Sequence, residues 1–383
     1  MLNLRYGRQR TFFAMRPKCA LAIVAMMSVV APCLGQRIQS PQVHQDGSVT
    51  FRFQSSSASQ VEVRIARVPG VARVALEKGE QGLWEATSPA LPAGIHEYHF
   101  LVDGTRAIDP HNRWIKKWYS LDSLVEVPGT PALVTELQSV PHGTLHHHTY
   151  QSAVIDGDRS AIVYTPPGYA RELDRVYPVL FLLHGFGDDQ TAWTEVGRAH
   201  LIADNLLAAN KIAPMVIVMP YGHPEPLPYG ERANDYGEKN DAKMAEDLIS
   251  ELLPLIESTY RVRKDRDARG IVGLSMGGGH SLRTGLGHAD QFAWVGAFSA
   301  AAPSGKNLLE QFPQLAGDQF PRKLLWIACG DKDFLLKRNQ QFVAGLKDAG
   351  VDHEYVESKG SHNWSVWRDE YLPQFLQLVF QSK

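Results

Sequence analysis

The sequence has few cysteines, only three in 383 residues. Cys19 and Cys33 fall in an N-terminal segment that we expect to be removed, which leaves Cys329 as the one cysteine of the mature chain. A single cysteine excludes an intramolecular disulfide framework. Because Cys329 ends the apolar run at residues 324–328, we expect a buried residue at the end of a strand and not a reactive thiol.

The chain also lacks an excess of charge of either sign. Lys and Arg number 39 and Asp and Glu number 41, so the formal net charge is -2. These charges are spread along the sequence, which argues against a nucleic-acid partner or an anionic membrane surface. With 44% hydrophobic and 21% charged residues, the chain can bury a large core and is not of the disordered class.

Long hydrophobic runs are missing beyond the N-terminus, where no stretch approaches the length of a transmembrane helix. The first 35 residues have the layout of an export signal, with several basic residues, an apolar run at residues 19–31 and small residues near Gly35. We therefore predict a signal peptide over residues 1–35 and a mature chain that begins at Gln36. Its location would be periplasmic or extracellular, without integral membrane association.

Residues 36–128 have the pattern of a small all-β domain. The run at 61–65 and other short runs alternate between apolar and polar side chains, which is the period of a half-buried strand. Asp103 and Gly104 favour a hairpin because both residues tolerate positive φ. Helical periodicity of useful length is absent, so we predict an immunoglobulin-like sandwich, followed by a linker at residues 129–140.

Residues 141–383 alternate between apolar β-runs and helical stretches. Short buried strands separated by helices predict a mostly parallel sheet covered on both faces. Ligands of such sheets bind at the carboxyl ends of the strands. The predicted strands are 177–183, 215–219, 270–273, 294–298 and 324–328, and the predicted helices are 199–209, 242–257, 277–286, 337–349 and 364–378.

The central chemical signal is the sequence Gly273-Leu274-Ser275-Met276-Gly277. It matches the nucleophile elbow, in which a strand turns sharply into a helix and glycines allow close backbone approach. A glycine-rich turn with an ordinary serine is the alternative, but a strand precedes this motif and a helix follows it. Ser275 is therefore the predicted nucleophile, with its hydroxyl near a helix N-terminus that favours a developing oxyanion.

A serine hydroxyl needs a base that removes its proton. In the α/β-hydrolase fold, where the nucleophile elbow occurs, the serine comes first along the chain, then the acid and then the histidine. His288, His353 and His362 come late enough in the sequence. We predict His362, because it lies in a loop between an expected strand and the last helix. His353 falls inside that strand, and His288 ends the helix that begins at the nucleophile.

The acid is expected just after the strand at 324–328, where both Asp331 and Asp333 are candidates. We prefer Asp333, because Asp331 follows the turn glycine immediately and is placed to cap or solvate that turn. Asp333 is placed to reach across the end of the sheet to the His362 loop. The fold geometry, which the sequence does not contain, decides between them.

Oxyanion donors are expected from two backbone positions. One is the N–H of Met276, directly after the nucleophile, and the other comes from the loop after the strand at 177–183. In that loop Phe186 is the expected donor and Gly187 the alternative, while His184 is expected to shape the loop.

The stretch at residues 220–236 is rich in Pro, Gly and Tyr and follows a strand end, so we expect it to line the substrate cleft. Tyr221, Tyr229 and Tyr236 are candidates for stacking on an aromatic acid or a sugar ring. Trp364, two residues after the predicted base, is a fourth candidate for substrate binding.

Three consecutive histidines, His146, His147 and His148, resemble a metal-binding tract. Alternation along a strand would send the middle ring to the opposite face, and no second cluster supplies a third ligand. We therefore predict no metal, and catalysis by a serine nucleophile requires no organic cofactor.

Four motifs together carry a family resemblance: Gly-Leu-Ser-Met-Gly-Gly, the His184-Gly185 loop, Cys-Gly-x-x-Asp-Phe and Gly-x-His-x-Trp. They resemble the esterase-D-like hydrolases, and most of all the feruloyl and acetylxylan esterases of the first carbohydrate esterase family. The segment before residue 128 resembles the early-set sandwich of glycogen-binding-like carbohydrate modules. Carried over by position, the family's triad falls on Ser275, Asp333 and His362.

The resemblance implies a secreted serine esterase that removes feruloyl or acetyl groups from xylan, an ester-bearing polysaccharide. Enterobactin-type siderophore esterases share the same motifs and are the main alternative. A carbohydrate-binding protein with a degenerate hydrolase domain is the non-enzymatic alternative, although all three triad positions are filled. Trp84, Trp114 and Trp118 could form a sugar-stacking face, but Trp84 lies within a strand and is expected in the core.

Overall fold

The computed structural model describes residues 38–383 except 69, 72, 229–234, 317–321 and 382–383. Residues Gln39–Lys383 form one compact unit. The predicted signal peptide lies outside the described residues. Within the described part of the chain, no helix is both long enough and apolar enough to cross a membrane.

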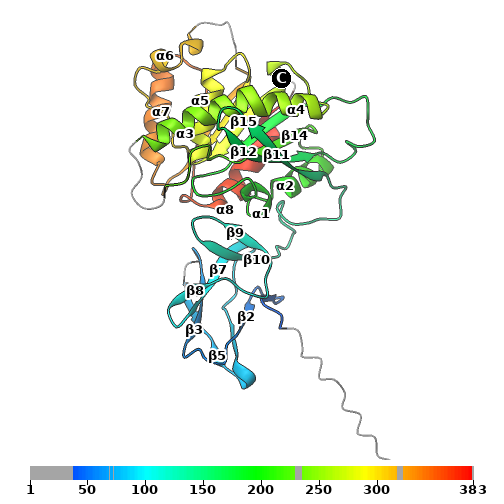
Figure 1. Ribbon diagram of the computed structural model, residues 1–383, viewed down its shortest axis with the longest axis vertical. Coiled ribbons are helices and arrows are strands. Elements are labelled where there is room, and N and C mark those ends of the chain that lie inside the picture. Colours follow the sequence, from blue (N-terminus) through cyan, green and yellow to red (C-terminus); the bar gives the residue numbers. More distant parts are fainter. Residues whose placement is uncertain (1–37, 69, 72, 229–234, 317–321, 382–383) are drawn as a thin grey trace, which may run out of the picture. The chain divides into compact units, whose positions relative to one another are not determined.

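The first part of this unit is an all-β region of two antiparallel sheets (Figure 1). One sheet has the order β1-β2-β6-β5, and the other has the order β4-β3-β7-β10-β9, with β8 paired to β7. Side chains from both sheets form one core, in which Phe51 and Tyr98 are in ring contact and Trp84 is 5% exposed. The expected core position of Trp84 is confirmed. The bounds are β1 (Gln42–Val43), β2 (Val49–Gln54), β3 (Val61–Ile65), β4 (Arg73–Ala75), β5 (Glu77–Lys78), β6 (Leu83–Thr87), β7 (Gly94–Val102), β8 (Thr105–Ala107), β9 (Ile115–Lys117) and β10 (Leu121–Val127), with a 3₁₀ turn η1 (Glu80–Gly82).

The second part is built on one eight-stranded sheet of order β11-β12-β14-β13-β15-β16-β17-β18. All neighbours from β14 to β18 are parallel, whereas β11 and β12 form an antiparallel edge. The prediction of a mostly parallel sheet is confirmed, but the antiparallel edge was not among the strands predicted for it. The bounds are β11 (Thr144–Ser152), β12 (Gly157–Thr165), β13 (Val179–Leu183), β14 (Val216–Pro220), β15 (Arg269–Leu274), β16 (Trp294–Phe298), β17 (Leu324–Gly330) and β18 (Glu354–Ser358).

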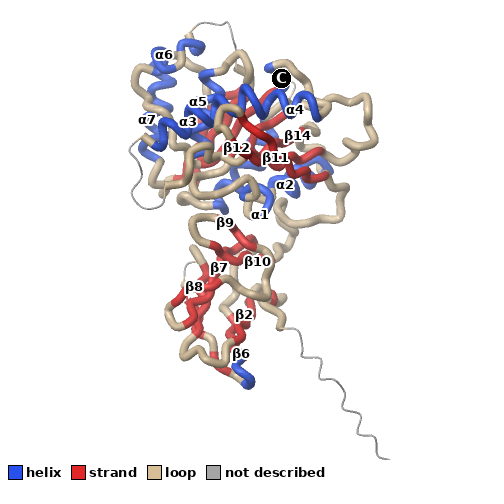
Figure 2. The backbone as a smooth tube through the Cα atoms, viewed as in Figure 1, coloured by secondary structure: helices blue, strands red, loops and turns tan. Residues whose placement is uncertain are grey.

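Helices cover both faces of this sheet (Figure 2), because successive residues of its central strands point to opposite sides. In β13, Leu180 and Leu182 join the core that contains α2 and α9, while Phe181 and Leu183 join the core that contains α4 and α5. The helical elements are α1 (Ala192–Glu195), α2 (Ala199–Ala208), α3 (Tyr236–Asp247), η2 (Leu248–Leu252), α4 (Leu253–Thr259), η3 (Arg266–Ala268), α5 (Met276–Gly287), α6 (Leu308–Gln311), η4 (Pro313–Leu315), α7 (Leu336–Asp348), α8 (Trp364–Val366), η5 (Trp367–Tyr371) and α9 (Leu372–Leu378).

Two of the predicted continuous helices, 242–257 and 364–378, each contain a π-helical turn. The turn η2 comes two residues before Pro254, and η5 comes two residues before Pro373. Proline has no N–H to donate, and its ring would clash with the carbonyl four residues earlier. A widened turn relieves that clash without ending the helix.

Candidate active site

Ser275 lies at the sharp turn between β15 and α5, with φ 54° and ψ -114°. Its backbone N–H donates to Phe298 O at 2.8 Å, and its carbonyl accepts from Ala301 N at 2.8 Å. Only glycine fits on either side of the turn. A Cβ at Gly273 would lie 2.6 Å from Gly277 backbone atoms, and one at Gly277 would lie 2.4 Å from His184 O. The backbone thus holds a serine in a strained conformation and exposes its hydroxyl at the strand end.

A chain of hydrogen bonds leads from Ser275 through His362 to Asp333. The Ser275 hydroxyl donates to His362 Nε2 at 2.9 Å, and His362 Nδ1 donates to Asp333 Oδ2 at 2.8 Å. Burial alone would raise the pKa of Asp333, but the hydrogen bond and charge interaction with His362, together with hydrogen bonds from Leu335 N–H and Ser299, outweigh it, and the pKa is lowered. The structure therefore brings together the three residues selected from the sequence, with the carboxylate on the far side of the imidazole.

Asp331 has a different set of partners. Its carboxylate accepts from Gly360 N at 3.0 Å and from Lys359 Nζ at 2.8 Å. It thus holds the base of the loop that carries His362, while Asp333 contacts the imidazole itself. The remaining histidine candidates lie elsewhere: His288 follows the end of α5, and His353 hydrogen-bonds to Val351 O.

The imidazole of His362 lies between two aromatic rings. Phe334 packs at 4.4 Å between ring centroids and Trp367 at 4.7 Å. The all-β region also reaches this loop, where Arg67 Nη1 donates to the carbonyl of His362 at 3.3 Å. These contacts restrict the movement of His362, because two aromatic rings pack against its imidazole and a hydrogen bond holds its backbone.

The loop between β13 and α1, residues 184–191, passes beside the nucleophile. A Cβ at Gly185 would lie 3.5 Å from Ser275 Cβ. Gly187 N donates to His223 Nε2 at 3.1 Å, so this N–H is committed to the loop itself. The hydrogen bond to His223 argues against Gly187, the alternative donor in this loop, and Phe186 and Met276 stay the predicted oxyanion donors.

His184 and His223 support this loop from behind. Burial lowers the pKa of His184 to about 4, so the ring is neutral at pH 7 and its Nε2 accepts from Gly222 N at 2.7 Å. His223 Nδ1 is 2.7 Å from the hydroxyl of Tyr236. The prediction that His184 shapes the loop agrees with these contacts.

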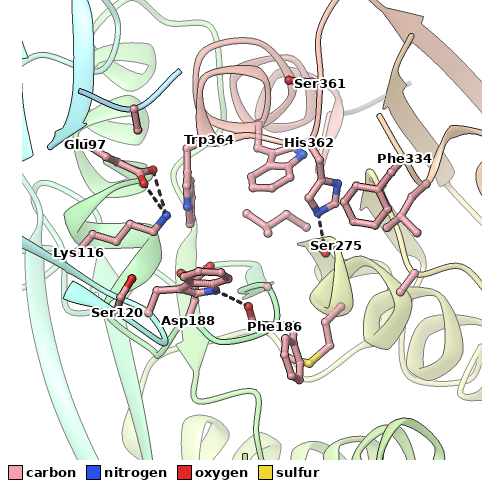
Figure 3. A pocket seen from close by; sticks show the side chains of 18 of the residues that line it. Glu97, Lys116, Ser120, Phe186, Asp188, Ser275, Phe334, Ser361, His362 and Trp364 are labelled. Carbon is pink, nitrogen blue, oxygen red and sulfur yellow. Dashed lines mark hydrogen bonds and ion pairs between the residues drawn. The ribbon is translucent and has the colours of Figure 1, made fainter. Parts of the chain in front are cut away.

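A cavity of about 1860 Å³ surrounds these groups, which exceeds the roughly 300–1,000 Å³ of ordinary small-molecule sites. Figure 3 shows Ser275, His362 and Phe334 on one side of it and Glu97 and Lys116 of the all-β region on the other. Its charged lining residues comprise Arg64, Arg67, Arg73, Arg106, Lys116, Arg283, Lys332 and Arg338 against Glu97, Asp122, Asp188, Glu238 and Asp241. Basic side chains thus outnumber acidic ones in a chain whose net charge is -2.

A family model described as "Putative esterase" matches residues 152–378, more than half of the chain. The chain belongs to this esterase family. The esterase is 30% identical over 350 residues to the endo-1,4-beta-xylanase/feruloyl esterase of Xylanibacter ruminicola, a match that covers 89% of this chain and 46% of that relative. It thus spans about half the length of that relative.

Solved structures place the esterase among the α/β hydrolases. A ferulic acid esterase is 30% identical, with a TM-score of 0.52 over 62% of this chain and 99% of that chain. The enterobactin esterase of Shigella flexneri has a TM-score of 0.61 over 87% of this chain and 93% of that chain. At 18% identity this second likeness shows the fold alone. Because it covers 87% of this chain, the similarity in fold extends into the all-β region.

The four predicted substrate-binding residues have different positions in the esterase. Trp364 and Tyr236 both line the cavity, and both are largely buried. Tyr221 is not among the cavity-lining residues of the described chain and packs on His184 instead. Tyr229 lies outside the described residues.

The histidine tract lies on the antiparallel edge of the sheet, in β11. His146 Nε2 hydrogen-bonds to Thr165, and His148 Nε2 to the hydroxyl of Tyr260. Among the described residues, no group of three or more His, Cys, Asp or Glu side chains could hold a metal ion. Cys329 is buried at the end of β17, as expected, and burial raises the pKa of its thiol to about 12.

Sequence reasoning missed two contributors to the site. His223 was not singled out, because the sequence around a lone histidine in a loop does not indicate which backbone N–H will donate to its ring. Phe334 was noted only as part of a family motif, yet this residue is 75% exposed and its ring contacts that of His362. A bulky aromatic directly after the predicted acid was the available signal for Phe334.

Asp188, in the same loop, is a buried carboxyl on the cavity wall. It is 5% exposed, and among the described residues its Oδ1 has no hydrogen-bond partner. Burial raises its pKa to about 7. Folding therefore favours the neutral carboxylic acid at this position.

Replacing Asp188 with asparagine should change how the free energy of unfolding depends on pH. Between pH 4 and 7 the unfolded carboxyl loses its proton before the folded one, so wild-type stability falls as pH rises. The variant should gain up to about 4 kcal/mol relative to the wild type across this window. Urea denaturation at pH 4.5 and pH 8 measures this gain. Asp189→Asn is the matched control, because the Asp189 carboxylate accepts a hydrogen bond from Thr191 N. If the free energy of unfolding of Asp188→Asn changed with pH in the same way as that of the wild type, the prediction would be contradicted.

Proposed function

We propose that this protein is an exported serine carboxylesterase that removes feruloyl or acetyl groups from xylan. The observation that carries the proposal is the hydrogen-bonded chain from Ser275 through His362 to Asp333, which lies in a large cavity at the carboxyl ends of parallel strands. A hydroxyl that donates to a neutral imidazole nitrogen, with a carboxylate on the other nitrogen, is the arrangement that activates serine.

The reaction follows from these positions. His362 Nε2 takes the proton of Ser275 as Oγ attacks the ester carbonyl, and Asp333 stabilises the resulting imidazolium. Backbone N–H groups of Met276 and Phe186 hold the oxyanion of the tetrahedral intermediate. His362 then protonates the leaving alcohol. Water, deprotonated by the same imidazole, attacks the acyl-enzyme, and the acid leaves as Ser275 recovers its proton.

Two findings support a plant-wall ester as the substrate. The likeness to the xylanase/feruloyl esterase of Xylanibacter ruminicola covers 89% of this chain, including the all-β region. The cavity is much larger than a feruloyl or acetyl group requires, and two exposed aromatic residues, Trp118 and Phe334, are positioned on its wall to stack on rings. The all-β region is then an early-set carbohydrate module, and the apolar N-terminal run supports export.

A siderophore esterase is the second candidate. The excess of basic residues around the cavity favours an anionic substrate, and catecholate siderophores carry acidic catechol groups. The fold likeness to the enterobactin esterase of Shigella flexneri also covers 87% of the chain.

Initial rates of the purified protein on methyl ferulate, acetylated xylan and a cyclic catecholate triester separate these candidates. We expect kcat/KM to be at least about 10-fold higher for one of the two plant-wall esters than for the siderophore. A single contact between substrate and pocket can change the ratio of kcat/KM between two substrates by about this factor. The opposite preference would overturn the substrate assignment and keep the mechanism. Folded protein that binds xylan without hydrolysing any of the three esters would favour the non-enzymatic binding protein.

A further inference from the structure

The peptide group between Phe186 and Gly187 is hydrogen-bonded on both sides. Trp118 Nε1 donates to the carbonyl of Phe186 at 2.9 Å, and Gly187 N donates to His223 Nε2 at 3.1 Å. This C=O and this N–H belong to one planar unit and point in opposite directions. The plane is therefore held from two opposite sides, by one residue of the all-β region and one residue of the hydrolase part.

Trp118 reaches this peptide from the turn between β9 and β10. Trp118 is 46% exposed, and its ring packs on Tyr119, whose own ring contacts Phe186 at 5.4 Å between centroids. The approach is possible because residue 187 is glycine with φ +84°. A Cβ at Gly187 would lie 2.4 Å from Trp118 Nε1. Glycine at this position thus serves two purposes, a left-handed backbone and space for the indole.

The preceding peptide group is held as well. The carbonyl of Gly185 accepts from Asp188 N at 3.2 Å and lies 2.8 Å from His184 Nδ1. The N–H of Phe186 lies in the same peptide plane as the Gly185 carbonyl. This plane meets the Phe186–Gly187 plane at the Phe186 Cα, so a shift of the second plane can turn the first and its N–H. An oxyanion donor is effective when it already points at the developing charge and need not reorient during the reaction.

We propose that Trp118 is a positioning residue of the esterase site. Its indole N–H fixes the Phe186–Gly187 peptide and so aims the Phe186 N–H at the oxyanion formed on attack by Ser275. This inference rests on the proposed function. It makes the all-β region part of the hydrolytic site itself, needed even for esters that contain no sugar.

The full-length variant Trp118→Phe tests the proposal, because phenylalanine keeps an aromatic ring but has no N–H to donate. On methyl ferulate, which has no sugar, we expect kcat to fall about 10- to 50-fold with KM within about twofold. Loss of a whole oxyanion donor costs about 10²- to 10³-fold, and a loosened donor should cost less. Thermal unfolding of the variant checks that the fold is retained.

The chain offers a matched control in Trp114→Phe. Trp114 Nε1 also donates from the all-β region to a hydrolase carbonyl, that of Glu195 at 3.2 Å, but Glu195 ends α1 and does not belong to the loop at 184–191. Both variants lose the same kind of hydrogen bond between the same two parts of the chain. We expect kcat of Trp114→Phe to stay within about twofold of the wild type.

A boronic acid that forms a tetrahedral adduct with serine gives a second readout, because the adduct places an oxygen in the oxyanion position. Its inhibition constant should rise in Trp118→Phe by about the factor lost in kcat, as expected of a transition-state analogue. Equal kcat values in the two tryptophan variants would overturn the inference. So would a Trp118→Phe variant with a raised KM on xylan esters and an unchanged kcat, since Trp118 would then bind substrate only. Absence of turnover in the wild type would instead overturn the proposed function, and this inference with it.

Discussion

Replacing Ser275 with alanine is expected to lower kcat on methyl ferulate by about 10⁵-fold or more. The hydroxyl donates directly to His362 Nε2, and no acyl-enzyme can form without its oxygen. The elbow should survive, because its shape depends on Gly273 and Gly277 and on backbone hydrogen bonds, none of which alanine removes. Burst kinetics with a chromogenic ester measure both the rate and the amount of acyl-enzyme, and both should vanish in the variant.

Ser361→Ala is the matched control for this experiment. Ser361 lines the same cavity one residue before His362, and its hydroxyl accepts from the side chain of Asn363. We expect its kcat to remain within about 10-fold of the wild type, since its loss removes one partly buried hydrogen bond. Retention of more than one hundredth of wild-type turnover by purified Ser275→Ala, with Ser361→Ala unchanged, would exclude Ser275 as the nucleophile.

The elbow could be predicted from the sequence because its requirements are local. A strand, two glycines that flank a serine at fixed spacing, and a following helix all lie within residues 269–287, and each glycine is required by a backbone contact at that turn. The parallel strands and most helices were predictable for the same reason. The spacing of apolar residues and the length of each apolar run are visible within a short stretch of sequence. The interrupted helices show the limit, because Pro254 and Pro373 change the helical turn without ending the helix.

Contacts between distant segments could not be predicted. Trp118 and Phe186 are 68 positions apart, and Arg67 and His362 are 295 apart. Neither pair follows from a period or a motif, because each depends on how the all-β region meets the hydrolase part. Sequence reasoning considered Trp118 only as a possible sugar-stacking residue. That role needs an exposed ring face, whereas the contact with Phe186 uses the indole N–H.

Asp331 and Asp333 illustrate the same limit over a shorter range. Both follow β17, and the sequence alone leaves both as candidates for the acid. The structure distinguishes them by their partners, since Asp333 accepts from His362 Nδ1 and Asp331 accepts from Gly360 N. Two residues of spacing change which atom of the neighbouring loop each carboxylate can reach.

Replacing Asp333 with asparagine should therefore lower kcat by about 10⁴-fold, while Asp331→Asn should lower it by less than about 10-fold. An amide at position 333 can donate to His362 Nδ1, which stabilises the tautomer whose Nε2 carries the proton and cannot accept one from Ser275. Asp331→Asn removes the same charge two residues away and keeps an oxygen that can accept from Gly360 N.

Steady-state rates of the two variants on methyl ferulate, with urea denaturation to compare their stabilities, measure this difference. Because both substitutions change one carboxylate to an amide in the same loop, a general effect of charge or of folding would act on both. A selective loss in Asp333→Asn means that the carboxylate acts on the imidazole and not on the shape of the loop. A larger loss in Asp331→Asn would move the acid to Asp331, and the hydrogen bond between His362 and Asp333 would then be structural.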